Sequence, residues 1–222
     1  MAGCLDNYIP LEKYESKVSE LEEANIIIDT NAIEIVDLKE ELNLTEDQLE
    51  KYNNLIDSLN DLLSNVYYGY ASNENWESDG FTAFSIEYKG KFYLITAGHC
   101  VHYKDDKIDA GVFTKIKVKN FKGDWIYPKL LKYENDYDNN RDYAILYSDK
   151  IIKGLEYDLN NSYPKFILGN LNKNILKELN IYNLLEGESG SPVVDLDGEV
   201  IGIATGNFVD IDLVLEAIDE LE

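Results

Sequence analysis

The chain has 222 residues, enough for one large or two modest domains, and with 45 % hydrophobic and 12 % aromatic residues it can bury a sizeable core. Its 43 acidic and 20 basic side chains give a net charge of −23, which repels nucleic acid and anionic lipid and excludes both as default partners. Two cysteines, Cys4 and Cys100, form neither a disulfide framework nor a zinc ligand set, and no apolar run is long enough to cross a bilayer.

Residues 1–10 are expected to form an N-terminal tail. Met1-Ala2-Gly3-Cys4 resembles the end of a bacterial lipoprotein signal, Leu-Ala-Gly-Cys, with its upstream part removed. On that interpretation Cys4 carries lipid, and the chain is exported and anchored to a membrane. The alternative is a soluble chain with a chance cysteine, so the sequence leaves the compartment open.

Residues 11–66 are predicted to form a helical coiled-coil stalk. The stretch 11–65 lacks glycine and proline, and apolar residues recur every seven positions among charged ones. The repeating positions are Tyr14, Leu21, Ile28, Ile35, Leu42, Leu49, Ile56 and Leu63. A helix with such a stripe has no core of its own to bury it in, so the stalk predicts a homo-oligomer, with a hetero-coiled coil as the alternative.

The stalk is either one long helix or two helices that meet near Asn43. The second apolar line changes phase near Leu38, as at a coiled-coil stutter. Thr45 and Gln48 also fit a capping box, which would start a new helix there. An unbroken helix of about 50 residues would be roughly 75–80 Å long.

From residue 67 to 222 the pattern changes to short Tyr-, Val- and Ile-rich runs separated by Gly, Asn and Asp, which predicts an all-β domain. Residues 81–88 and 92–95 flank a glycine turn and predict a hairpin. Further strands are expected at 111–118, 125–131, 142–147, 165–168, 179–184, 192–195 and 200–205. Apolar residues at helical spacing in 212–221 predict a C-terminal amphipathic helix.

Three short segments carry the candidate chemical groups. His99 ends an apolar run, Asp142 heads another, and Ser189 lies within Gly187-Glu188-Ser189-Gly190-Ser191-Pro192. Each alone has an ordinary explanation: a core histidine, a strand-capping aspartate and a glycine-rich turn. The second histidine, His102, is expected at the surface.

Together and in this order, the segments Thr96-Ala97-Gly98-His99-Cys100, 142–146 and 187–192 resemble the three signature blocks of the chymotrypsin/trypsin-like serine endopeptidases. The blocks of that family are Thr-Ala-Ala-His-Cys, an Asp heading an apolar strand, and Gly-Asp-Ser-Gly-Gly-Pro. The resemblance runs from about residue 78 to the C-terminus and is greatest to compact bacterial members. It implies two antiparallel Greek-key β-barrels with a C-terminal helix in a protease domain spanning 67–222.

The resemblance also implies a hydrolase that acts on proteins or peptides. Ser189 would be the nucleophile, His99 the general base, and Asp142 the residue that orients the imidazole. The backbone N–H groups of Gly187 and Ser189 would form the oxyanion hole. Neither a cofactor nor a metal is expected.

The sequence departs from the family pattern in ways that bear on specificity and control. Many secreted members pair the cysteine after the histidine with an upstream one, but that position here is near Phe84, so Cys100 is expected to be a buried free thiol. No Ile-Val-Gly-Gly-like segment is present for release by zymogen cleavage. By resemblance the primary pocket would be floored near Asn183, where the lack of an acidic residue favours a neutral side chain.

By the same resemblance, Ile203, Ala204 and Thr205 would pair with the substrate backbone as an added strand. Three hypotheses then remain: an active endopeptidase on an oligomeric stalk, a catalytically silent binding module, and a coiled-coil protein whose protease domain cuts only itself or its assembly partner. The complete triad argues against the second, and the sequence leaves the other two open.

Overall fold

The computed structural model describes residues 45–78, 80–104, 107–160, 164–170, 173–179, 184–185 and 187–221. The chain divides into two units, Met1–Glu50 and Lys51–Glu222, and the second carries the sheets described below. The predicted tail, most of the predicted stalk, and Asn183, which was predicted to floor the primary pocket, lie outside the described residues. None of the helices in the described ranges is both long and apolar enough to span a membrane.

The helix of residues 45–63 leads directly into the first strand. Within the second unit its last turns pack into the core: Leu55 is 1 % exposed and Leu63 is 4 % exposed. Ile56, which is on the same heptad line as Leu63 but two turns earlier, is 58 % exposed. The predicted stalk therefore includes residues, from Leu55 onward, that contribute to the hydrophobic core of the second unit.

The first sheet has seven antiparallel strands in the order β5-β4-β1-β2-β3-β7-β6. Lys89 and Gly90 both have positive φ in the tight turn between β2 and β3, which confirms the predicted hairpin. The strands are β1 (Val66–Ser72), β2 (Phe81–Tyr88), β3 (Lys91–Thr96), β4 (Lys115–Lys119), β5 (Trp125–Ile126), β6 (Lys129–Asp136) and β7 (Arg141–Tyr147). Two short 3₁₀ helices, η1 (Gly98–Cys100) and η2 (Tyr137–Asn139), follow β3 and β6.

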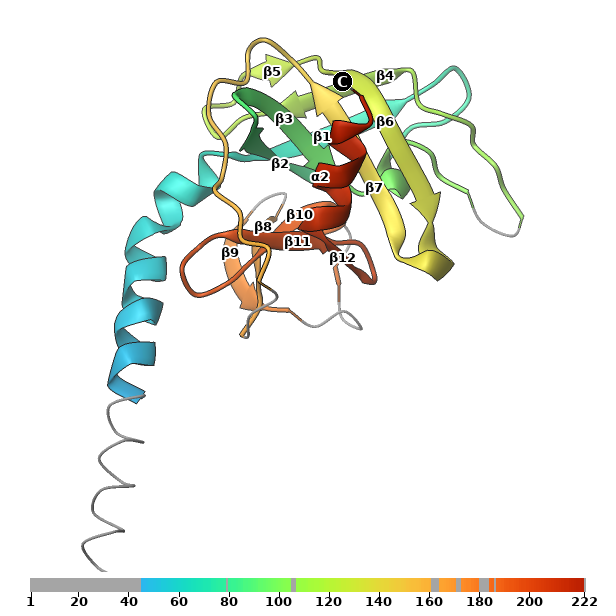
Figure 1. The fold of residues 1–222 in the computed structure, drawn as a ribbon. Coiled ribbons are helices and arrows are strands. Elements are labelled where there is room, and N and C mark those ends of the chain that lie inside the picture. Colours follow the sequence, from blue (N-terminus) through green and yellow to red (C-terminus); the bar gives the residue numbers. More distant parts are fainter. Residues whose placement is uncertain are drawn as a thin grey trace, which may run out of the picture. The chain divides into compact units, whose positions relative to one another are not determined.

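The second sheet has five strands in the order β12-β11-β10-β8-β9. They are β8 (Phe166–Asn170), β9 (Lys173–Glu178), β10 (Ser191–Val194), β11 (Val200–Ala204) and β12 (Phe208–Asp210). The C-terminal helix α2 (Ile211–Asp219) buries its apolar side against β7 and β11. Figure 1 shows the two sheets as separate layers, with α2 beside β7.

These elements confirm the prediction of a mostly β domain that ends in an amphipathic helix. Among the described strands, neither sheet closes on itself, since β5 and β6 are the outer strands of the first and β12 and β9 those of the second. Closure into two Greek-key barrels therefore stays a prediction. One core lies on the seven-stranded sheet, and a larger one joins both sheets, residues 55–63 of the preceding helix, and α2.

Candidate active site

His99 and Asp142 are brought together by neighbouring strands. His99 lies in η1, just after β3 ends, and Asp142 is the second residue of β7, which pairs with β3. The His99 Nδ1 lies 2.6 Å from Asp142 Oδ2, and the His99 backbone N–H donates to Asp142 Oδ1 at 2.8 Å. Asp142 is 1 % exposed, and both of its carboxylate oxygens contact His99.

Gly98 allows this arrangement because the backbone of β6 passes very close to it. A Cβ at Gly98 would lie 1.8 Å from the carbonyl oxygen of Glu134. The Glu134 side chain accepts hydrogen bonds from the Arg141 guanidinium at 2.6 and 2.9 Å and from the Tyr143 hydroxyl at 2.6 Å. These bonds join β6 to β7 on either side of Asp142, which fixes the strand that carries the carboxylate.

The pKa of His99 is raised well above the ordinary histidine value. Burial of the ring acts in the opposite direction and lowers the pKa. The neighbouring Cys100 sulfur, when ionised, and the hydrogen bond to Asp142 favour the imidazolium and outweigh burial. The hydrogen bond to Asp142 therefore favours the protonated form of the His99 ring.

The segment that carries Ser189 is held by Thr82 of β2. The Thr82 N–H donates to the Ser189 carbonyl at 3.0 Å, and the Thr82 hydroxyl donates to the Gly187 carbonyl at 2.7 Å. Gly187 has φ of +84°, a conformation that glycine adopts without strain. Among the described residues, neither the Gly187 N–H nor the Ser189 N–H donates a hydrogen bond.

His99 and Ser189 line the same cavity, which has a volume of about 380 Å³. Gly187 lines it as well. No hydrogen bond of the described residues joins His99 to the Ser189 hydroxyl. The two side chains are related by lining the same cavity. The structure thus places three of the predicted site residues, His99, Gly187 and Ser189, around one cavity, and the fourth, Asp142, is buried against His99.

No protein-family model matches the sequence, and no curated protein matches it. Solved structures do match. The Rv3671c protease from M. tuberculosis in its active form superposes with a TM-score of 0.55 at 14 % identity, over 73 % of this chain and 83 % of that one. The HtrA-type protease AlgW with a tripeptide superposes with a TM-score of 0.53 at 18 % identity, over 72 % of this chain and 60 % of that one. The serine endoprotease from Yersinia pestis superposes with a TM-score of 0.52 at 17 % identity, over 74 % of this chain and 66 % of that one.

The fold is that of a chymotrypsin-like serine protease. At these identities the likeness concerns the fold alone. The chain spans 60 % of the AlgW chain and 66 % of the Yersinia chain, so it matches only part of each.

Two of the predicted substrate-pairing residues lie elsewhere in this protease fold than expected. Ile203 and Ala204 are fully buried in β11, which pairs with β10 on one side and β12 on the other. Both edges of β11 are therefore used within the sheet, and these two residues cannot pair with a substrate strand in this arrangement. The Thr205 N–H donates to the Asn207 carbonyl at 2.9 Å, within the turn that joins β11 to β12.

The remaining cysteine and histidine of the described part have clear positions. Cys100 is a buried free thiol, as predicted, and its sulfur lies 3.9 Å from the Ser189 carbonyl oxygen.

His102 is not a simple surface residue, because its side chain is only 18 % exposed and its Nε2 lies 2.8 Å from Asp109 Oδ1. The hydrogen bond with His102 lowers the pKa of Asp109. This second His–Asp pair was missed because only the first matched a family block.

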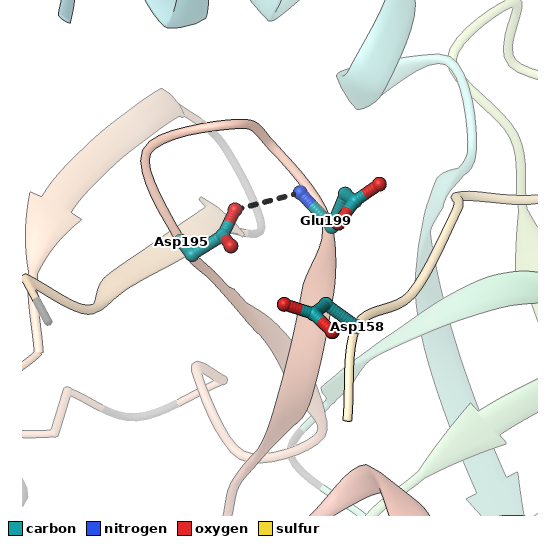
Figure 2. A group of neighbouring side chains, drawn as sticks. All are labelled: Asp158, Asp195 and Glu199. Carbon is teal, nitrogen blue, oxygen red and sulfur yellow. Dashed lines mark hydrogen bonds between the residues drawn. The ribbon is translucent and has the colours of Figure 1, made fainter. Parts of the chain in front are cut away.

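Figure 2 shows an acidic cluster formed by Asp195 and Glu199, in the turn between β10 and β11, and by Asp158, in the segment between β7 and β8. Their carboxylate oxygens lie within 4.8 Å of one another, a spacing that a hard cation could bridge. Asp195 also accepts the N–H groups of Asp197 and Glu199, at 2.9 and 3.1 Å. Burial and the adjacent carboxylates raise the pKa of Glu199. Because Asp195 holds the turn, we assign the cluster a structural role.

Proposed function

We propose that the chain is a serine endopeptidase that cleaves peptide bonds through an acyl-enzyme on Ser189. The observation that carries the proposal is the 2.6 Å contact between His99 Nδ1 and the buried Asp142 carboxylate, beside a cavity that His99 shares with Ser189. A buried carboxylate that holds one imidazole nitrogen leaves the other free to take a proton from a hydroxyl. The protease fold of the chain is consistent with this chemistry.

In the proposed mechanism the Ser189 hydroxyl attacks the substrate carbonyl while His99 Nε2 takes its proton. Asp142 holds the Nδ1–H, fixes the tautomer, and stabilises the imidazolium. The carbonyl oxygen, now negative, accepts hydrogen bonds from the N–H groups of Gly187 and Ser189, each contributing about 3 kcal/mol. His99 then gives its proton to the departing amine. Water attacks the acyl-enzyme with His99 again as base, which releases the acid and restores Ser189.

The proposal is tested by treating the protein with a fluorophosphonate and measuring its intact mass. We expect one adduct on the unsubstituted protein and none on either Ser189→Ala or His99→Ala, because the reagent labels only a serine activated by its base. Circular dichroism on all three proteins controls for folding. A folded protein that forms no adduct would contradict the proposal and favour a silent binding module. Labelling without turnover of added peptides would favour a protease that cuts only itself or its partner.

We further propose that residues N-terminal to Lys51 display the protease on a coiled-coil homo-oligomer. The heptad positions from Tyr14 to Leu49 all precede Lys51, and Ile56, the next position, is exposed within the second unit. Apolar residues in this pattern need a partner helix. The acidic composition leaves nucleic acid out of the proposed partners, and a membrane partner depends on lipid at Cys4.

Deleting residues 1–50 should therefore lower the oligomeric state and leave a folded protease unit. Deleting residues 1–65 should also unfold or strongly destabilise that unit, because it removes Leu55 and Leu63 from the core, at roughly 2–5 kcal/mol for each buried leucine. Light scattering gives the oligomer number and thermal unfolding the stability. An unchanged oligomer number after the shorter deletion would overturn the stalk proposal.

A further inference from the structure

The cavity beside His99 and Ser189 has an apolar floor and an aromatic rim. Phe81, Cys100 and Phe113 form the floor and are 1 %, 6 % and 4 % exposed. Trp76 and Tyr103 form the rim and are 44 % and 43 % exposed. An apolar depression with exposed aromatic rings at its edge is suited to an apolar side chain, since burial there removes both surfaces from water.

Hydrogen bonds tie together two of the segments that line this cavity. The Asn73 Oδ1 accepts the Trp76 N–H at 2.9 Å, and the Asn73 Nδ2 donates to the Ala110 carbonyl at 2.7 Å; both Trp76 and Ala110 line the cavity. Next to them, Ser78 exchanges two hydrogen bonds with Ala71 of β1, each 2.8 Å long. The turn that carries Trp76 is thus tied both to the sheet and to the segment that carries Ala110 and Phe113.

The position of the cavity indicates which part of a substrate would enter it. In the proposed mechanism the departing nitrogen must be close to His99, which gives it a proton. The fragment attached to that nitrogen therefore starts at His99. The cavity extends from His99 and Cys100 toward Trp76, and among the described residues none that line it belongs to β11. It lies where the first side chain of the leaving fragment would be.

We propose, on the basis of the proposed peptidase function, that this cavity selects substrates with a large apolar residue directly after the cleaved bond, and that Trp76 is the residue that determines this preference. Glu77 also lines the cavity and is exposed, so it disfavours an acidic residue at that position. Burial of a leucine- or phenylalanine-sized side chain predicts a preference of about 10–100-fold over glycine.

The test uses internally quenched peptides that differ only in the residue after the cleaved bond, Leu or Gly. We expect the unsubstituted protein to cleave the Leu peptide with a kcat/KM about 10–100-fold higher, and Trp76→Ala to lose most of that ratio. Trp125→Ala is the matched control, since Trp125 of β5 is 37 % exposed and does not line the cavity. A methyl ester of the same acyl group, which releases only methanol and so places no side chain in the cavity, should be hydrolysed equally by all three proteins.

Equal cleavage of the Leu and Gly peptides would overturn the inference. An equal loss of kcat/KM by Trp76→Ala on the ester and on the Leu peptide would also overturn it. That result would mean that Trp76 contacts the acyl part of the substrate or supports the fold. Failure of the peptidase proposal is seen separately, as a missing fluorophosphonate adduct on the unsubstituted protein. An intact adduct on Trp76→Ala shows that the substitution leaves the reacting groups in place.

A binding measurement tests the cavity even if the chain does not turn over. The sequence has only two tryptophans, so in a Ser189→Ala, Trp125→Phe protein all tryptophan fluorescence comes from Trp76. We expect a tripeptide that begins with Leu to change this fluorescence saturably, and one that begins with Gly to bind about 10-fold more weakly or less. Equal affinities, or no change with either peptide, would contradict the proposal.

Discussion

Replacing Asp142 with asparagine is expected to lower kcat about 10⁴-fold without unfolding the protein. An asparagine oxygen can still accept the His99 backbone N–H, which Asp142 Oδ1 accepts at 2.8 Å. The amide nitrogen would then face His99 Nδ1 and donate to it, which places the imidazole proton on Nε2. That tautomer cannot take a proton from Ser189. Peptide kinetics on the purified variant, with thermal unfolding as the check on the fold, measure the effect.

The same substitution should change the pH dependence. His99 must be neutral to act as a base, so kcat/KM falls when the pH is lowered through the His99 pKa. Because the pKa of His99 is raised, the acid limb of the unsubstituted protein should lie above pH of about 6.5. In Asp142→Asn the hydrogen bond that favours the imidazolium is lost, and the limb of the residual activity should move to lower pH.

The matched control for this prediction is Asp109→Asn, which alters the other His–Asp pair of the chain. Asp109 Oδ1 lies 2.8 Å from His102 Nε2, a contact similar to that between Asp142 and His99. The Asp109 side chain is 52 % exposed and His102 does not line the cavity, so we expect a change of no more than a few-fold. A loss in Asp109→Asn as large as that in Asp142→Asn would show that neither aspartate acts through a specific base.

The proximity of the residues around the candidate site could be predicted from the sequence because each of them lies in a recognisable local pattern. His99 and Asp142 lie next to apolar runs that form β3 and β7, and those strands pair, so two ordinary strand signals were sufficient to bring them together. Ser189 lies in a turn whose glycines adopt positive φ at Gly187 and Gly190. Such requirements are visible in a single short segment.

Other features depend on contacts between distant segments and gave no comparable signal. Val66 was predicted to end the stalk, yet it is the first residue of β1. In that strand Tyr67 lies on the buried face and Tyr68 and Tyr70 lie on the other, so no alternation of apolar and polar residues marked it as a strand. Leu55 and Leu63 are core residues only because β8 and its neighbours supply apolar surface beside the helix. The rim residue Trp76 belongs to a loop without a motif, so its place at the cavity follows from the fold alone.

Gly190→Ala is expected to lower the rate of fluorophosphonate labelling by at least about 100-fold, since displacement of a reacting group by an ångström can cost that much. A Cβ at Gly190 would lie 2.1 Å from both the Thr82 carbonyl oxygen and the Thr96 hydroxyl, which are themselves hydrogen-bonded at 2.7 Å. Both of these atoms are buried, so the new methyl must push the Ser189 segment away from β2. The bonds from Thr82 that hold Ser189 and Gly187 would lengthen, and the oxyanion-binding N–H groups would move with them.

Gly90→Ala separates this clash from backbone strain. Gly90 has φ of +76° and Gly190 of +86°, so alanine is strained at both, at a cost of roughly 1–2 kcal/mol. A Cβ at Gly90 meets nothing within 4 Å. We therefore expect Gly90→Ala to lower the melting temperature by a few degrees and to keep the labelling rate, whereas Gly190→Ala loses more stability and nearly all labelling. Equal behaviour of the two variants would mean that the contact with Thr82 does not position Ser189.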